Sequence, residues 1–267
     1  MEVKARIVGL HRMPVQAASQ TRLRTVAGLS KWLGHIKGFL QADAYGGYDG
    51  IYATGVKEVA CWAHGRRHFF DAKDTDARRC AQMLSMVRVL YAVEDQANAQ
   101  IATTPDATFD QADAIRLALR QQKSVPILAT IKAWLDTEQK LVLPRSPMAG
   151  ATNYMLNQWD ALCVYTQHGF LNIDHNAAER ALRRVGMGRK NWLFAGHDFA
   201  AQRTATRYSL LASAERHGLD PQRYLIGVLA RIAATPIRQL EQFLPDRWKA
   251  ADVVVTPKLH DSPASPI

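Results

Sequence analysis

Residues 36–64 read IKGFLQADAYGGYDGIYATGVKEVACWAH and contain two apolar runs separated by a turn-rich segment. The first run, 36–43, predicts a short strand that an aspartate, Asp43, closes. The second run, 57–64, predicts another buried strand, because its middle is almost continuously apolar. Residues 43–53, rich in tyrosine and glycine, predict a short helix or turn between the two.

The chain downstream of these runs is predicted to be mostly helical. Cys80, Leu84, Val87 and Tyr91 recur at spacings of four, three and four residues, which places them on one helix face. After a brief extended piece at 170–173, capping and proline signals predict further helices. Beyond residue 100 the predicted helices are, one range each, 106–122, 126 onward, 148–167, 174 or 176 to 185, 203–217, 221–234 and 236–245.

Composition limits the class of protein. The 267 residues include 34 lysines and arginines against 24 acids, a net charge of +10, and 48% are apolar. Such a chain can bury a core, and no apolar run is long enough to predict a membrane span. Three widely spaced cysteines suit a reducing cytoplasm rather than a disulfide framework. The positive charge favours a polyanionic partner, with nucleic acid first.

The basic residues are unevenly distributed. Residues 1–40 hold seven basic side chains and one acid, and residues 176–207 hold seven against two. The second segment also contains Trp192, Phe194 and several glycines, a mixture typical of surfaces that follow phosphates, although a solvated face is the alternative. The residues predicted to contact DNA are Arg66, Arg67, Arg180, Arg183, Arg184, Arg189 and Lys190.

Two carboxylates are candidates for a metal site. Asp43 ends a predicted strand and Glu179 lies on a predicted helix, with Asn176 and Arg183 on the same helix face. Hard cations such as Mg²⁺ take oxygen ligands, and such ions assist phosphoryl transfer. Under the alternative interpretation, Asp43 caps a turn and Glu179 pairs with neighbouring arginines.

Cys61 and His64 form half of a zinc-ligand spacing. No second Cys-x-x-Cys pair is present, and His68 lies four residues after His64. We therefore interpret Cys61 as a core residue and His64 as a hydrogen-bonded or site-facing histidine. The sequence has no Gly-x-Ser-x-Gly elbow for nucleophilic catalysis.

Several segments together resemble the insertion-sequence-66 family of bacterial transposases, over roughly residues 36–249. They are GFLQADAYGGYDGIY (38–52), VACWAHGRRHFFDA (59–72), LPRSPMAGATNYMLNQWDAL (143–162), IDHNAAERALRRVGMGRKNWLFAG (173–196) and the stretch from Tyr208 to Trp248. The resemblance implies an α/β but mostly helical fold, with an incomplete ribonuclease-H-like core of the Asp-Asp-Glu type.

The resemblance also implies domains and site residues. It assigns 35–201 to a catalytic domain with a helical insertion at about 76–168, and 204–249 to a small helical C-terminal domain. Residues 1–34 stay outside it, and 250–267 are predicted to be a disordered tail. The motifs place the second catalytic aspartate at Asp43 and the catalytic glutamate at Glu179. The resemblance implies that these two residues bind Mg²⁺ or Mn²⁺.

One departure bears on activity. The first catalytic aspartate of such a core should precede Asp43, yet residues 1–42 contain no aspartate, and Glu2 is their one acid. We therefore expect a truncated or rearranged copy of a transposase, with impaired or no activity. A non-catalytic DNA-binding remnant and a non-functional fragment are the alternatives. The expected partner is DNA, at the termini of the element and at the target. The sequence does not decide whether the chain forms a homo-oligomer or binds accessory proteins of the same element.

Overall fold

The computed structural model describes residues 37–180, 183, 187 and 198–248. These residues form two compact units, one of residues 37–180, 183 and 187 and one of residues 198–248, which we describe separately. Residues 198–201, which the sequence assigns to the catalytic domain, belong to the second unit. The predictions for residues 1–34 and for the tail 250–267 lie outside the described residues.

The first unit contains the two predicted strands. β1 (Phe39–Ala42) and β2 (Lys57–Ala60) are parallel, with Phe39 opposite Lys57 and Ala42 opposite Ala60. Between them the chain forms the 3₁₀ turn η3 (Gly46–Tyr48) and the short helix α3 (Asp49–Tyr52), which confirms the predicted helix or turn. These are the only strands in the described part of the chain.

The second strand is shorter than the sequence predicts. β2 ends at Ala60, Cys61 is still extended, and helix α4 (Trp62–Asp71) begins at the next residue. The prediction of a strand to residue 64 is therefore wrong, because an apolar run alone does not distinguish a buried strand from a buried helix start. Trp62, the first residue of α4, is fully buried, and its indole Nε1 donates to the carbonyl of Leu162 at 2.9 Å.

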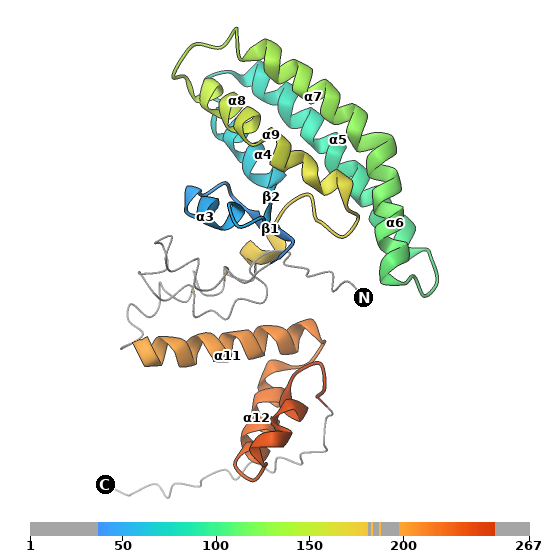
Figure 1. The fold of residues 1–267 in the computed structure, drawn as a ribbon, viewed down its shortest axis with the longest axis vertical. Coiled ribbons are helices and arrows are strands. Elements are labelled where there is room, and N and C mark those ends of the chain that lie inside the picture. The colour runs from blue at the N-terminus through green and yellow to red at the C-terminus, as the bar shows by residue number, and fades with distance from the viewer. Residues whose placement is uncertain (1–36, 181–182, 184–186, 188–197, 249–267) are drawn as a thin grey trace, which may run out of the picture. The chain divides into compact units, whose positions relative to one another are not determined.

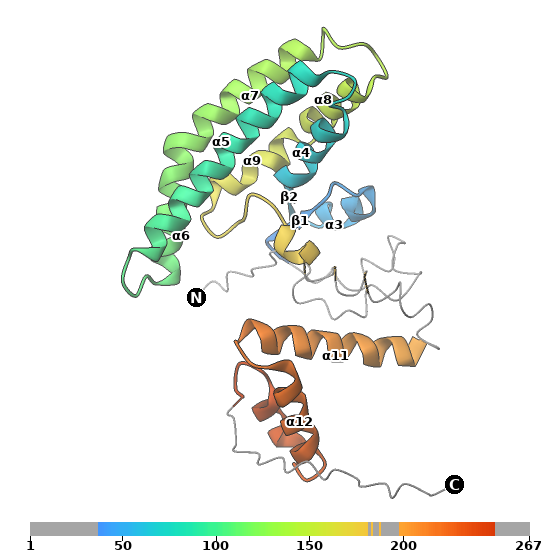
Figure 2. The ribbon, with the colours of Figure 1, turned by 180° about the vertical axis from the view of Figure 1, so that it is seen from behind.

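A helical region follows α4 and supplies most of the core. The helix α5 (Ala77–Ala102) confirms the predicted long helix. Of the predicted face, Cys80 and Val87 are fully buried and Leu84 and Tyr91 are half-buried, and Met83 and Leu90 are fully buried as well. Both views show α5 beside α7 (Val125–Glu138) (Figures 1 and 2). The other elements are α6 (Phe109–Leu119), a π-helical turn η4 (Arg120–Ser124), α8 (Pro147–Asn157), α9 (Trp159–Cys163) and the 3₁₀ turn η5 (Val164–Gln167).

Two predicted boundaries in this region differ from the structure. The chain passes from α6 to α7 through the π-helical turn η4 without a break, and Pro126, which has no N–H to donate, directly follows this turn as the second residue of α7. The single helix predicted over 148–167 is instead divided into α8, α9 and η5 at Gln158. No strand forms at 170–173, which is irregular.

A glycine allows α4 to approach α8 closely. A Cβ atom on Gly65 would lie 2.3 Å from the sulfur of Met155, which is buried. Larger side chains at this position would separate the two helices. The contact holds α4, which carries several candidate site residues, against the core of the unit.

The second unit consists of α11 (Asp198–Arg216), α12 (Pro221–Ile232) and the 3₁₀ turn η6 (Ile237–Phe243). Its turn signals are those that the sequence predicts. Gly218 has a φ of 72° after the end of α11, and the side chain of Asp220 accepts from the amide of Arg223 to cap α12. The Tyr224 hydroxyl donates to the Phe243 carbonyl at 2.6 Å.

The described residues are thus mostly helical with one small parallel sheet, which confirms the mostly helical fold expected from the sequence. None of their helices combines the length and apolar character needed to cross a membrane.

Candidate functional site

The parallel sheet brings two candidate residues to one edge. Asp43 follows β1 directly and Cys61 follows β2 directly, and Ala42 pairs with Ala60 in the register. Carboxyl ends of parallel strands meet at the same edge of a sheet, where α/β proteins commonly bind ligands. The Asp43 side chain is exposed there, and the next residue, Ala44, turns the chain with a φ of 61°.

A segment from far along the chain is attached to this edge. Gln41 in β1 donates through Nε2 to the carbonyl of Asn172 at 2.9 Å, and the amide of Trp62 donates to the carbonyl of Ile173 at 3.2 Å. Residues 176–180 then form the first turns of a helix. The two hydrogen bonds therefore carry the start of this helix to the strand ends.

Asp174 orients the start of that helix. Its carboxylate accepts from the amide of Asn176 at 3.1 Å and from the Asn176 side chain at 2.7 Å. The Tyr91 hydroxyl on α5 donates to the same carboxylate at 2.7 Å. The sequence indicates Asp174 only as a possible cap, and its link to Tyr91 depends on tertiary structure.

Two histidines contact Glu179 at this edge. Its Oε1 lies 3.4 Å from Nε2 of His64 and 3.1 Å from Nε2 of His175. The two imidazole rings are stacked, with centroids 5.0 Å apart and planes 16° from parallel. The ion-pair partners of Glu179 in the described part of the chain are thus these histidines rather than the neighbouring arginines of the alternative interpretation.

Several neighbouring charged groups affect the pKa of the His175 imidazole. Burial lowers the pKa of His175, and the neighbouring His64 acts in the same direction. Glu179, Asp43 and Asp174 oppose this and favour the protonated imidazole. Both predicted carboxylates thus lie near enough to His175 to affect its pKa, and Asp174 is a third carboxylate that the sequence does not single out for this site.

Cys61, His64 and His175 form a second set of potential ligands in the same place. One ligand atom from each residue lies within 4.8 Å of the others. His68, which the sequence places at a suitable spacing from His64, instead packs on Tyr154 with ring centroids 4.2 Å apart. The sequence does not identify His175 as a partner of Cys61, because no local spacing connects them.

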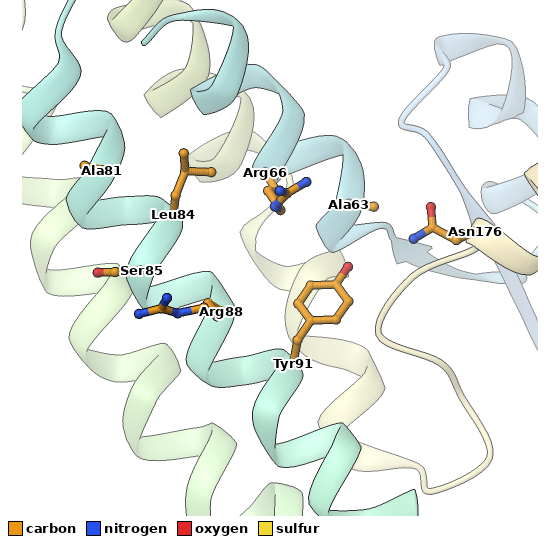
Figure 3. Close-up of a pocket in the computed structure, with 8 residues that line it drawn as sticks. All are labelled: Ala63, Arg66, Ala81, Leu84, Ser85, Arg88, Tyr91 and Asn176. Carbon is orange, nitrogen blue, oxygen red and sulfur yellow. The ribbon is translucent and has the colours of Figure 1, made fainter.

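A pocket adjoins the cluster on the side of α5 (Figure 3). Its volume is about 620 Å³. Arg66 from α4 and Arg88 from α5 line it, and neither forms an ion pair within the described residues. The other lining residues are Ala63, Ala81, Leu84, Ser85, Tyr91 and Asn176. Because Tyr91 and Asn176 both bind Asp174, the pocket is continuous with the supports of the carboxylate cluster.

The remaining residues predicted to contact DNA are located differently. Arg67 is 77% exposed and lies 3.7 Å from Asp71 of the same helix. Arg180 and Arg183 are exposed on the helical segment that carries Glu179. Arg184, Arg189 and Lys190 lie outside the described residues. Arg88 and Tyr91 were not predicted as site residues, because their pattern is that of an ordinary amphipathic helix.

The donor set suits a hard divalent cation. Asp43 and Glu179 offer carboxylate oxygens, and the Glu179 side chain is 50% exposed, so an ion can reach it from solvent. These two residues could hold Mg²⁺ or Mn²⁺ at the carboxyl edge of the sheet. Asp174 is less available, since Tyr91 and Asn176 already bind its oxygens.

Comparison with known proteins gives a family for most of the chain. The family described as "Transposase IS66 family" matches residues 11–203, and the "IS66 C-terminal element" matches residues 209–245. The first match also includes residues 11–34, which contain none of the motifs that resemble the family. No solved structure matches the chain.

The similar curated proteins come from Sinorhizobium fredii (strain NBRC 101917 / NGR234). "Uncharacterized protein y4hP" is 33% identical over 239 residues, which cover 83% of this chain and 41% of that protein. "Uncharacterized protein y4jD" is 31% identical over 240 residues, covering 86% and 45%. This chain therefore spans less than half the length of these relatives. Since the family match covers most of its residues, the chain belongs to the IS66 family of transposases.

Proposed function

We propose that this chain provides part of the catalytic centre of an insertion-sequence transposase, which cleaves and joins DNA strands with a divalent metal ion held by Asp43 and Glu179. The observation that carries the proposal is the position of the two residues at one edge of the sheet: Asp43 directly follows β1, and Glu179 lies 3.4 Å from His64, near the start of the helix that follows β2. They come from distant parts of the sequence and meet at the carboxyl edge of a parallel sheet. A ribonuclease-H-like core is part of this proposal, and the pair β1 and β2 would belong to its sheet.

The residues around the carboxylates have separate roles in this proposal. When bound, Mg²⁺ or Mn²⁺ would polarise a phosphodiester and stabilise the attacking and leaving oxygens. His64 and His175 hold the Glu179 carboxylate in place from one side. Asp174 fixes the start of the helix that carries Glu179, so we assign it a positioning role.

The DNA backbone would lie across the pocket of Arg66 and Arg88. Guanidinium groups bind phosphates through paired hydrogen bonds, and these two arginines have no carboxylate partner among the described residues. The exposed Arg180 and Arg183 extend the positive charge along the Glu179 helix. Arg184, Arg189 and Lys190 continue the same basic stretch of sequence and remain proposed DNA contacts.

A DNA-binding role without catalysis is the second candidate. The observation that favours it is the set of arginines near the site: Arg66 and Arg88 line one pocket, and Arg180 and Arg183 are exposed on the Glu179 helix. Contacts of these guanidinium groups with phosphates require no bound metal. Both candidates bind DNA through the basic residues, but only the first cleaves and joins DNA strands.

A strand-transfer assay separates the candidates. The purified chain is incubated with duplexes that carry the termini of its element and with Mg²⁺ or Mn²⁺, and cleaved and joined products are resolved on gels. Products that disappear in Asp43→Asn and Glu179→Gln support the catalytic proposal. No product with either ion, together with retained salt-sensitive DNA binding, overturns it and supports the second candidate.

A further inference from the structure

We propose that Cys61, His64 and His175 form a binding site for a zinc-type transition-metal ion, distinct from the oxygen-ligand site of Asp43 and Glu179. The three side chains converge from two segments. Cys61 and His64 lie at the start of α4, and His175 precedes the helical turn at 176–180. One ligand atom from each lies within 4.8 Å of the others.

This arrangement is close to the dimensions of a zinc site. Zinc binds sulfur at about 2.3 Å and imidazole nitrogen at about 2.0–2.1 Å, so tetrahedral ligand atoms lie about 3.4–3.8 Å apart. Small side-chain rotations would close the observed set around an ion. Three protein ligands with one open position are also a common zinc arrangement.

Unsatisfied nitrogens support the assignment. Nδ1 of His64 and Nδ1 of His175 are both buried without a hydrogen-bond partner. Buried polar atoms in folded proteins are normally paired, and those that are not require an explanation such as a missing ion. Nε2 of each ring already faces Glu179, so each imidazole is oriented before any ion binds.

The sulfur lies in the same place. Cys61 is fully buried and directly follows β2, one residue before α4 begins. The thiolate is the form that would bind metal, so binding would release the thiol proton. The site stays accessible from the imidazole side, because the His64 side chain is 25% exposed.

The ligand types determine which ion is preferred. Thiolate and imidazole select zinc and similar ions, whereas carboxylate oxygens suit Mg²⁺ and Mn²⁺. Zinc bound here would hold the two histidines that contact Glu179 and so fix that carboxylate. Binding requires neither DNA nor strand transfer, so it can be tested apart from the proposed catalysis.

Cobalt titration of the metal-free chain tests the site. Co²⁺ bound by a thiolate gives a charge-transfer band in the near ultraviolet, and Zn²⁺ should abolish the band by displacement. We expect about one ion per chain. The band should be absent in Cys61→Ser and present in the matched control Cys163→Ser, whose thiol lies in α9 away from this cluster.

Two further variants make the result decisive. His175→Gln keeps the thiol and should weaken Co²⁺ binding by at least about tenfold, which covers the case in which Cys61→Ser fails to fold. Glu179→Gln should keep the thiolate band, because the glutamate is not one of the three ligands. Absence of the band in the folded wild-type chain, or its persistence in folded Cys61→Ser, would overturn the proposal.

Discussion

Two charged clusters in the first unit each join segments that are distant in sequence, but they differ in how their polar atoms are satisfied. Arg120 is 1% exposed and forms a bidentate pair with Glu94, with nitrogen–oxygen distances of 2.8 and 2.6 Å. Its remaining nitrogen donates to the carbonyls of Tyr165 and His168 at 3.0 and 2.8 Å. Glu179 is half exposed, and its two histidine partners each retain a buried nitrogen without a partner.

This difference is the one expected between a structural cluster and the ligand site that we propose. A buried ion pair is compatible with a stable fold when its charged groups are hydrogen-bonded, as Arg120 and Glu94 are. Around Glu179 the incomplete bonds and the solvent access leave room for ions and phosphate. The Arg120 cluster also supports the other one indirectly, since it holds the chain just before the segment that carries Asp174, His175 and Glu179.

The largest effect is expected from Glu179→Gln, which removes the charge and keeps the size of the side chain. If strand transfer occurs, its rate should fall by about 10³-fold, since metal-held charge stabilisation is worth several kcal/mol. The melting temperature should change little, because the side chain is half exposed. Single-turnover assays with Mg²⁺ measure the rate, and an unchanged rate would exclude Glu179 from the catalytic centre.

Arg120→Ala tests the structural cluster. It leaves the Glu94 carboxylate buried without its partner and should lower the free energy of unfolding by about 3–5 kcal/mol. The matched control is Lys132→Ala on α7, whose partner Asp136 is exposed and whose loss should cost less than about 0.5 kcal/mol. Urea unfolding of both variants provides the measurement. Equal effects would contradict a special role for the Arg120 cluster.

Arg66→Glu and Arg67→Glu compare two adjacent arginines of α4. Arg66 lines the pocket beside the carboxylates, whereas Arg67 is exposed and lies near Asp71. Arg66→Glu should weaken DNA binding by about tenfold and reduce the salt dependence by about one phosphate contact. Arg67→Glu should have a much smaller effect. Fluorescence anisotropy at several salt concentrations would detect the difference, and equal losses would place the DNA elsewhere on α4.

The smallest effect concerns a helix cap far from the candidate site. Asp76 accepts from the Arg79 amide at 3.1 Å and from its guanidinium at 2.8 Å, and these hydrogen bonds lower the pKa of Asp76. Its stabilisation is therefore present above its unfolded pKa near 3.8 and is lost as the pH falls through the folded value.

Asp76→Ala should accordingly cost about 1 kcal/mol at pH 7, and the cost should shrink as the pH falls below about 4. Urea unfolding at several pH values measures this trend. Asp95→Ala, at an exposed position within α5, serves as the control and should show no such loss. A cost that grows toward low pH would contradict the assigned direction of the pKa shift.

Local patterns in the sequence were enough to predict β1, the turn around α3, the long helix α5 and the capped start of α12 at Asp220. Each depends on periodicity or on a cap within a few residues, and such interactions act in any context. The motifs also indicated the family, and the family match confirms it.

Tertiary structure alone decided which side chains meet at the site. Three features depend on packing between distant segments. They are the end of β2 at Ala60, the contact of His64 with Glu179, and the position of Arg66 and Arg88 in one pocket. An apolar run has the same pattern in a strand and in a buried helix start, so the sequence could not place that boundary. The net charge and the motifs were enough to predict a nucleic-acid partner and the family. The position of the proposed metal site depends instead on the hydrogen bonds that hold residues 172 and 173 at the sheet edge, because these bonds bring the Glu179 segment to the strand ends.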